Sequence, residues 1–169
     1  SEARLEGADL SGARLEGADL SWARLEGAVL AGARLEGADL WQARLEGAVL
    51  AGARLEGAVL SWARLEGADL SGARLDDRTL LTDATLRGAS VRSVDWQNVS
   101  LSPDQILSMF GDGSVILPGG VKPGEQGWPE HWPERELGWG EFEEEWRKWQ
   151  ADPEGYEPPP VPVEAEEGE

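Results

Sequence analysis

A five-residue hydrophobic period runs through the first half of the chain. Leucine occupies every fifth position from Leu5 to Leu80, and alanine stands two residues before it in every unit except the one that contains Arg78. A helix cannot use this period, because five residues advance a helix by about 500° and successive leucines would spiral around it. The glycine in nearly every unit also disfavours a helix. The pattern therefore predicts a non-helical repeat.

The spacing inside each unit predicts a solenoid. Alanine and leucine lie two residues apart, which places both on one face of a very short strand. The next two residues, most often Glu-Gly or Ser-Gly, then turn the chain, and glycine suits the turn position that requires positive φ. A chain that keeps turning in this way, with every leucine inside, stacks its coils into a rod.

These units resemble those of the pentapeptide-repeat family, in which the unit is Ala-(Asp/Asn)-Leu-x-x. Residues 8–12, Ala-Asp-Leu-Ser-Gly, match it directly, whereas the Ala-Arg-Leu-Glu-Gly units keep its spacing and replace the acid with arginine. The resemblance covers residues 3–101 and implies an all-β solenoid, a right-handed quadrilateral parallel β-helix of about five coils. At about 4.8 Å per coil the rod would be about 24 Å long. The resemblance also implies a bacterial, cytoplasmic protein.

The period shifts once near the end of the repeats. After Leu80 the next core positions are predicted at Leu86, Val91, Trp96 and Leu101, so one extra residue lies between Leu80 and Leu86. We expect a local bulge there, followed by a final, less regular coil. The repeat domain is thus predicted to span residues 1–101.

A short helix is predicted directly after the repeats. Residues 102–105, Ser-Pro-Asp-Gln, have the sequence of a capping box with proline at the first helical position, and Gly111 stands where a glycine stop belongs. We expect a helix over residues 103–110, in a segment 102–111, that covers the open edge of the last coil. The side chains assigned to this cap are Ser102 and Gln105 as the capping box, and Leu101 and Ile106 as a hydrophobic staple.

The remainder of the chain, residues 112–169, is a tryptophan-rich acidic tail. Residues 112–152 are rich in Trp, Pro and Gly and contain a second predicted helix at about 141–151. Acidic residues lie near its start and basic residues near its end, which the helix dipole favours. Asp152-Pro153 ends this helix. Residues 153–169 are rich in Pro and Glu, which predicts an extended polyproline stretch followed by disordered acidic chain.

Tryptophans gather at one outer corner of the predicted rod. Stacking at twenty residues per coil brings Trp22, Trp41 and Trp62 together, and we call these residues the tryptophan corner. Because bulky residues rarely accept positive φ, we predict that this corner is not a type II turn. An exposed aromatic column usually marks a contact.

We hypothesise that the tail folds back along the rod and covers this corner, since a fully solvated tail would not need so many aromatic side chains. The alternative is that the second helix docks on another protein. The proposed docking residues of the tail are Trp128, Trp132, Trp139, Phe142, Trp146 and Trp149.

The net charge of −18 is concentrated in the tail, because residues 1–80 carry −5 and residues 102–169 carry −13. Some pentapeptide-repeat proteins are known as DNA mimics that inhibit or protect topoisomerases. A rod of about 24 Å would need roughly 14 negative charges to imitate DNA, far more than these repeats carry. Arginine columns interleaved with acids on two walls also argue against binding to nucleic acid itself.

The residue inventory argues against an enzyme. There is no cysteine, and His131 is the single histidine, so no catalytic triad, thiolate site or multi-histidine metal site can be built. No phosphate-binding glycine loop is present, and a rod filled with leucine offers no pocket. We expect no cofactor and no metal. No apolar run approaches the length of a membrane span.

The sequence therefore predicts a non-enzymatic structural scaffold or protein-interaction module whose partner it does not identify. One alternative is a DNA-mimic binder or inhibitor of a topoisomerase such as gyrase. Another is a designed or fragmentary rod with no specific ligand, which would self-associate through its open first coil. The near-identity of the units and the absence of a leading methionine keep this last alternative open.

Overall fold

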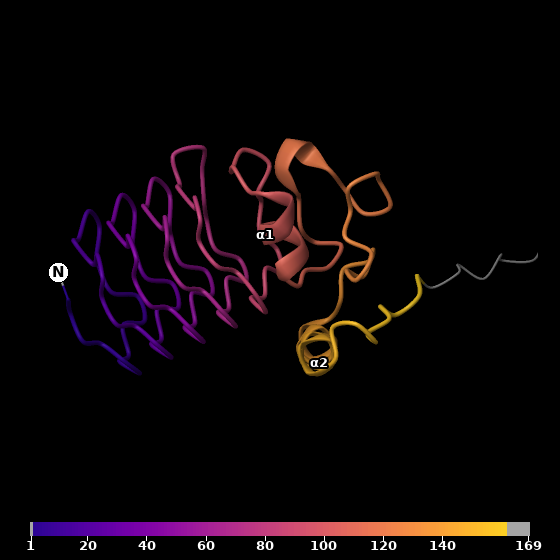
Figure 1. Cartoon of the computed structure of the whole chain (residues 1–169), viewed down its shortest axis with the longest axis horizontal. Helices are drawn as coiled ribbons and strands as arrows, with labels where there is room; N and C mark the ends of the chain where they lie inside the picture. Colours follow the sequence, from indigo (N-terminus) through magenta and orange to yellow (C-terminus); the bar gives the residue numbers. More distant parts are fainter. Residues whose placement is uncertain (1, 162–169) are drawn as a thin grey trace, which may run out of the picture.

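The structure is a computed structural model that describes residues 2–161, and it shows a stack of coils with the tail folded over one end (Figure 1). Residues one coil apart pair in parallel, so the walls are columns of bridges. In the first two coils the pairs are Arg4 with Arg24, Asp9 with Val29, Arg14 with Arg34 and Asp19 with Asp39. Each wall contributes isolated bridges, where the sequence predicted short strands.

The backbone of each coil is hydrogen-bonded to both neighbouring coils. The amide of Arg24 donates to Ala3 O of the preceding coil at 2.8 Å, and the amide of Leu25 donates to Arg44 O of the following coil at 2.7 Å. Between these walls every core alanine and leucine from Ala23 to Leu65 is fully buried. The Ala-x-Leu spacing thus fixes one continuous core, and the residue between them always faces outward.

The shift in the period lies one unit earlier than predicted. Leu80 pairs with Val59, an outward position, and is 47% exposed, whereas Leu81 is buried. The extra residue therefore lies between Leu75 and Leu81, and the predicted slip between Leu80 and Leu86 is wrong. Asp76 organises this enlarged turn, because its Oδ1 accepts the amide of Gly57 on the preceding coil at 2.8 Å.

The solenoid also continues beyond Leu101, the predicted end of the repeat domain. Ser90 pairs with Phe110, and Asp95 pairs with Ile116, so a partial sixth level is present. The helix α1 (Pro103–Ser108) is one side of this level and lies within the coil path (Figure 1). It is followed by a short 3-10 turn, η1 (Pro118–Gly120), and by the helix α2 (Trp139–Ala151) in the tail.

Gln105 joins α1 to the coil beneath it. Its Oε1 accepts the amide of Ser102, and the Ser102 hydroxyl accepts the amide of Gln105, which completes the capping box. Its Nε2 donates to Leu81 O at 2.8 Å and to Ala84 O at 3.0 Å. The side-chain amide thus supplies a donor to the coil edge where the helix has replaced the wall.

The tryptophan corner has the same backbone conformation as the glycine corners, contrary to the prediction. Trp22, Gln42 and Trp62 have φ of 62°, 53° and 63°, close to the 65° of Gly47. The stack imposes this geometry, because Trp22 N donates to Trp41 O at 2.9 Å and Trp62 N donates to Thr82 O at 2.9 Å. Hydrogen bonds between coils therefore outweigh the local preference of a bulky residue.

This strain predicts opposite effects of two substitutions. Gln42→Gly is expected to raise the free energy of unfolding by about 1 kcal/mol, because it removes the left-handed strain of a residue with a Cβ. Gly47→Ala is expected to lower it by about 1 kcal/mol, and the effect is conformational because a Cβ there has no atom within 4 Å. Urea denaturation of both variants measures the changes. Destabilisation by both would show that the turn conformation is not the deciding factor.

Two opposite walls carry ladders of ion pairs along the rod. From Arg24 to Arg74, each wall arginine lies 2.8–3.0 Å from a glutamate oxygen of the preceding coil, as in Arg24–Glu6, Arg44–Glu26 and Arg74–Glu56. Exposed pairs of this kind contribute only about 0.2–1 kcal/mol each. Their main consequence is electrostatic, because these walls present paired charges instead of a row of one sign.

Candidate functional site

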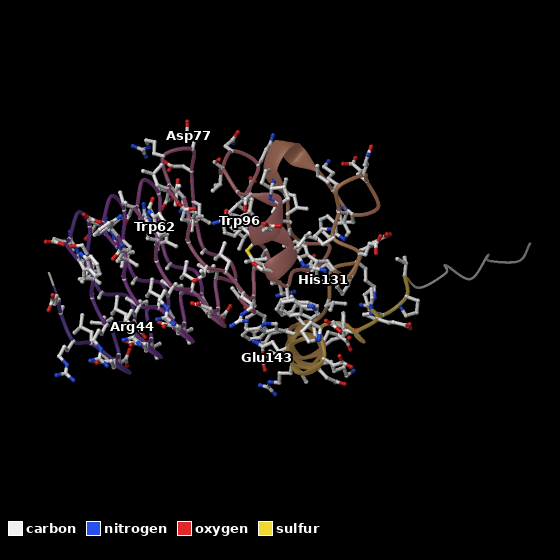
Figure 2. The ribbon with its side chains drawn as sticks, viewed as in Figure 1. Arg44, Trp62, Asp77, Trp96, His131 and Glu143 are labelled. Carbon is white, nitrogen blue, oxygen red and sulfur yellow. The ribbon has the colours of Figure 1, made fainter. Side chains whose placement is uncertain are left out.

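The tail covers the end of the solenoid formed by the last coil, and the hypothesis that it covers the tryptophan corner is wrong. Its aromatic residues contact Phe110 and its neighbours at this end, with Phe142 and Trp149 each 5.5 Å from the Phe110 ring. Trp22 and Trp62 remain 50% and 54% exposed. Figure 2 shows Trp62 on the coil stack and His131 at the covered end.

Trp132 fills the core position that Gly111 leaves empty. A Cβ on Gly111 would lie 2.7 Å from the Trp132 ring, and Trp132 is 1% exposed. Its Nε1 donates to Met109 O at 2.8 Å. Gly111 is therefore required for packing, and the prediction that it ends α1 is wrong, because the helix ends at Ser108 with Met109 as its C-cap.

A buried carboxylate holds the tail against the last coil. Asp112 is fully buried, accepts the amide of Leu137 at 2.8 Å, and lies 3.5 Å from the Nε of Arg92. Arg92 also donates to Leu137 O at 2.7 Å, and its guanidinium lies 5.4 Å from the Trp139 ring centre. This arrangement places charged partners from the repeat and the tail in one cluster, and sequence reasoning missed it.

The helix α2 packs its apolar side on the end of the solenoid. Phe142 and Trp149 are buried, while Trp146 is partly buried and donates from Nε1 to Gly88 O at 2.9 Å. The tail then returns over the same surface, where Tyr156 lies edge-on to Phe110 and donates to Glu145 of α2 at 2.9 Å. Residues 162–169, the end of the predicted acidic stretch, lie outside the described residues.

His131 supports this covered end in its neutral form. Its Nε2 lies 2.9 Å from Met109 O, and its ring stacks on Trp149 at 5.2 Å. Burial lowers the pKa of His131 below its ordinary value of 6.5, which the hydrogen bond to Met109 opposes only in part. The folded state therefore prefers the uncharged imidazole.

The lowered pKa predicts a loss of stability on acidification. Below pH 6.5 the unfolded chain binds a proton at His131 that the folded chain does not, so stability falls as the pH drops through this value towards the lower folded-state pKa. Melting temperatures of the chain and of His131→Phe between about pH 7.5 and pH 5.5 measure this. The variant is expected to melt with a weaker pH dependence, and equal dependence in both proteins would contradict the assignment.

The tryptophan corner is the one sequence-predicted surface that stays accessible. Trp22 and Trp41 make an edge-to-face pair with centroids 5.1 Å apart. Leu80, which the shifted period turns outward, is also exposed, and it lies on the wall that leads into this corner. Sequence reasoning missed Leu80 because it counted this residue among the core leucines.

The described residues 2–161 contain no group of three or more His, Asp or Glu side chains placed to hold a metal ion. Within the same part of the chain, no helix is both long and apolar enough to cross a membrane.

Solved structures with similar repeats come from plants, cyanobacteria and a resistance plasmid. A pentapeptide repeat protein of the Arabidopsis thaliana thylakoid lumen is 35% identical over 61% of this chain and 71% of its own, with a TM-score of 0.42. Rfr23 of the cyanobacterium Cyanothece 51142 is 42% identical over 47% of this chain and 57% of its own, with a TM-score of 0.39. The plasmid-mediated fluoroquinolone resistance protein QnrB1 is 18% identical over 72% of this chain and 74% of its own, with a TM-score of 0.39.

The family model for pentapeptide repeats matches residues 3–42 and 43–77, in eight copies. No curated protein sequence matches the chain. Within the matched residues the alanines and leucines point into the core and the turns carry positive φ values, and the coil geometry continues beyond them to Ile116. On these grounds the chain belongs to the pentapeptide-repeat family.

Proposed function

We propose that this protein is a non-enzymatic scaffold that binds a protein partner through the tryptophan corner. The observation that carries the proposal is the set of three exposed indoles, 36–54% accessible, on a corner that the tail leaves uncovered. Large exposed aromatic side chains are the residues that most often dominate the binding energy of protein interfaces. The right-handed quadrilateral winding that the family resemblance implies is part of the same proposal.

The backbone supports this choice of surface. At the other corners of the first coils the residue with positive φ is glycine, whereas here it is Trp22, Gln42 or Trp62. A residue with a Cβ in this conformation costs about 1–2 kcal/mol. Within residues 2–80 this strain is retained in one column, where glycine would relieve it, and this supports a use for the side chains themselves.

The DNA-mimic alternative has less support from the coil surfaces. On two walls the arginines lie beside glutamates, with Arg34–Glu16 and Arg54–Glu36 both at 2.8 Å, so these walls offer no continuous negative face. A mimic would have to use the acidic tail. An assay of DNA supercoiling by gyrase tests this alternative, and inhibition at micromolar protein would favour it over the scaffold.

Capture of partners from a cell extract tests the proposed function. The intact chain is compared with a variant carrying Trp22→Asn, Trp41→Ser and Trp62→Asn, in which asparagine is chosen because it tolerates positive φ. Trp139→Ser is the matched control, since Trp139 is also about half exposed but lies in the tail. We expect a protein retained by the intact chain and the control to be lost from the triple variant. Retention by all three proteins would contradict the proposal.

A further inference from the structure

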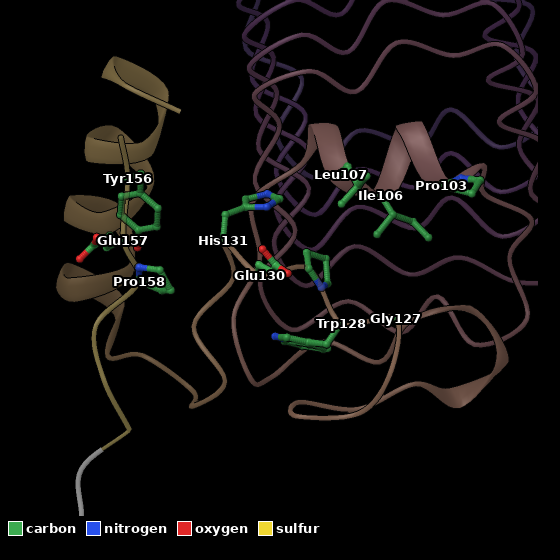
Figure 3. A pocket seen from close by; sticks show the side chains of 11 residues that line it. Pro103, Ile106, Leu107, Gly127, Trp128, Glu130, His131, Tyr156, Glu157 and Pro158 are labelled. Atoms are coloured by element: carbon green, nitrogen blue, oxygen red, sulfur yellow. The ribbon is translucent and has the colours of Figure 1, made fainter. Parts of the chain in front are cut away.

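A concave surface lies at the covered end of the rod, away from the tryptophan corner. A cavity of about 810 Å³ opens between α1, the loop around Trp128 and the chain at Tyr156 (Figure 3). A smaller cavity of about 350 Å³ adjoins it and shares Trp128, Pro129, Glu130 and Pro158 as lining residues. The two together form an elongated depression, which we call the acidic groove.

The floor and sides of the acidic groove are largely apolar. Ile106 and Leu107 of α1 line one side, and Leu107 is 55% exposed. Trp128, Tyr156 and Pro158 contribute flat rings to the same cavity. A surface of this kind gains free energy when an apolar chain covers it, and its two connected cavities suit an elongated ligand.

The available polar groups of the groove are acceptors. The Nε1 of Trp128 already donates to Trp132 O, and the hydroxyl of Tyr156 already donates to Glu145. Glu130 and Glu134 are exposed and take part in no ion pair within residues 2–161. His131, which also lines the cavity, is kept neutral by burial.

No lysine or arginine lines either cavity, although the smaller one adds the carboxylates Glu125 and Glu134. A ligand with a positive charge would therefore meet carboxylates in both cavities and no lysine or arginine among their lining residues. Aromatic faces beside these carboxylates also favour a cation, and arginine most of all. The complementary ligand is thus a cation carried on an apolar chain.

We propose that the acidic groove binds a peptide segment of another protein that presents an arginine between apolar residues. The guanidinium pairs with Glu130 where the two cavities meet, Glu134 lies further along the groove, and the flanking apolar side chains cover Ile106, Leu107 and the prolines. Guanidinium groups bind carboxylates through paired hydrogen bonds, which fixes the register of the peptide. This site is separate from the tryptophan corner, so it stands whether or not the corner binds a partner.

The probe is the peptide acetyl-Pro-Leu-Arg-Leu-amide, titrated into the full chain while the indole N–H signals are followed by NMR. Its counterpart with citrulline keeps the shape of arginine and removes the charge. We expect saturable shifts of the Trp128 signal with the arginine peptide, and affinity for the citrulline peptide at least about tenfold lower. Shifts confined to Trp22, Trp41 and Trp62 would place binding at the corner and overturn the proposal.

Two double variants separate this site from general attraction to an acidic protein. Glu130→Gln with Glu134→Gln is expected to weaken binding of the arginine peptide about tenfold. Asp77→Asn with Asp83→Asn removes the same charge from exposed positions on the solenoid and is expected to leave the affinity unchanged. Equal losses in both variants, or no loss in the first, would overturn the proposal. Melting curves check that both variants stay folded.

Discussion

Trp132→Ala is expected to lower the free energy of unfolding of the covered end by about 3–5 kcal/mol, the range for removing a large buried aromatic side chain. The indole occupies the core position over Gly111 and donates to Met109 O at 2.8 Å. Alanine would leave a cavity there. It would also remove one of the two side-chain partners of Met109 O, the other being Nε2 of His131. Urea denaturation followed by the remaining tryptophans, with limited proteolysis of the tail, measures the loss.

Trp139→Ala is the control for this experiment. Trp139 also belongs to the tail but is 52% exposed, and it rests on Arg92 without filling the core. We expect its removal to cost less than about 1 kcal/mol. If the two variants were equally stable, Trp132 would not hold the tail on the solenoid in the way described.

Asp112→Ala is expected to weaken the attachment of the tail by about 1–3 kcal/mol, because it removes a buried acceptor, while the partly buried Arg92 keeps Glu136 as a second partner. The side chain of Asp112 is fully buried, and it also accepts the amide of Leu137 at 2.8 Å, which loses its acceptor in the variant. Hydrogen exchange of the tail amides, Leu137 among them, measures the detachment directly. Faster exchange limited to the tail is the expected pattern.

Glu141→Gln provides the comparison, because Glu141 pairs with Arg135 within the tail at the surface. Exposed ion pairs contribute at most about 1 kcal/mol, so this variant should keep the tail protected. Protection that survives in Asp112→Ala as well would contradict the view that the buried carboxylate anchors the tail.

The repeat could be derived from the sequence almost completely, because the period of five leaves one way to bury every alanine and leucine. The position of the shift does not follow from the leucine spacing alone, because Leu80 and Leu81 are adjacent and either could serve as the core leucine. The residue two positions earlier decides between them. Thr79 is 3% exposed and occupies the position of the core alanine for Leu81. The small side chain of Thr79, next to the charged and outward-facing Arg78, therefore indicates that Leu81 is the core leucine.

The tryptophan corner could be located from the sequence, but its backbone could not. Helix and turn propensities describe the backbone conformation that Trp22 prefers in isolation, whereas its conformation here is set by a hydrogen bond to Trp41 on the following coil. The surface on which the tail packs is equally hard to derive, because aromatic residues indicate that the tail is buried against something but do not identify the surface. Gly111 is the residue that points to the covered end, because a glycine at a core position leaves a space that a side chain from another segment must fill.

Hydroxyl-radical footprinting of the intact chain, with oxidation quantified at each tryptophan, tests the central claim that the tail closes the end of the rod and leaves the tryptophan corner free. We expect fast oxidation of Trp22, Trp41 and Trp62, which are 50%, 36% and 54% exposed. Trp132 and Trp149, which are 1% and 6% exposed, should be protected. Protection of the corner together with oxidation of Trp132 and Trp149 would contradict the account.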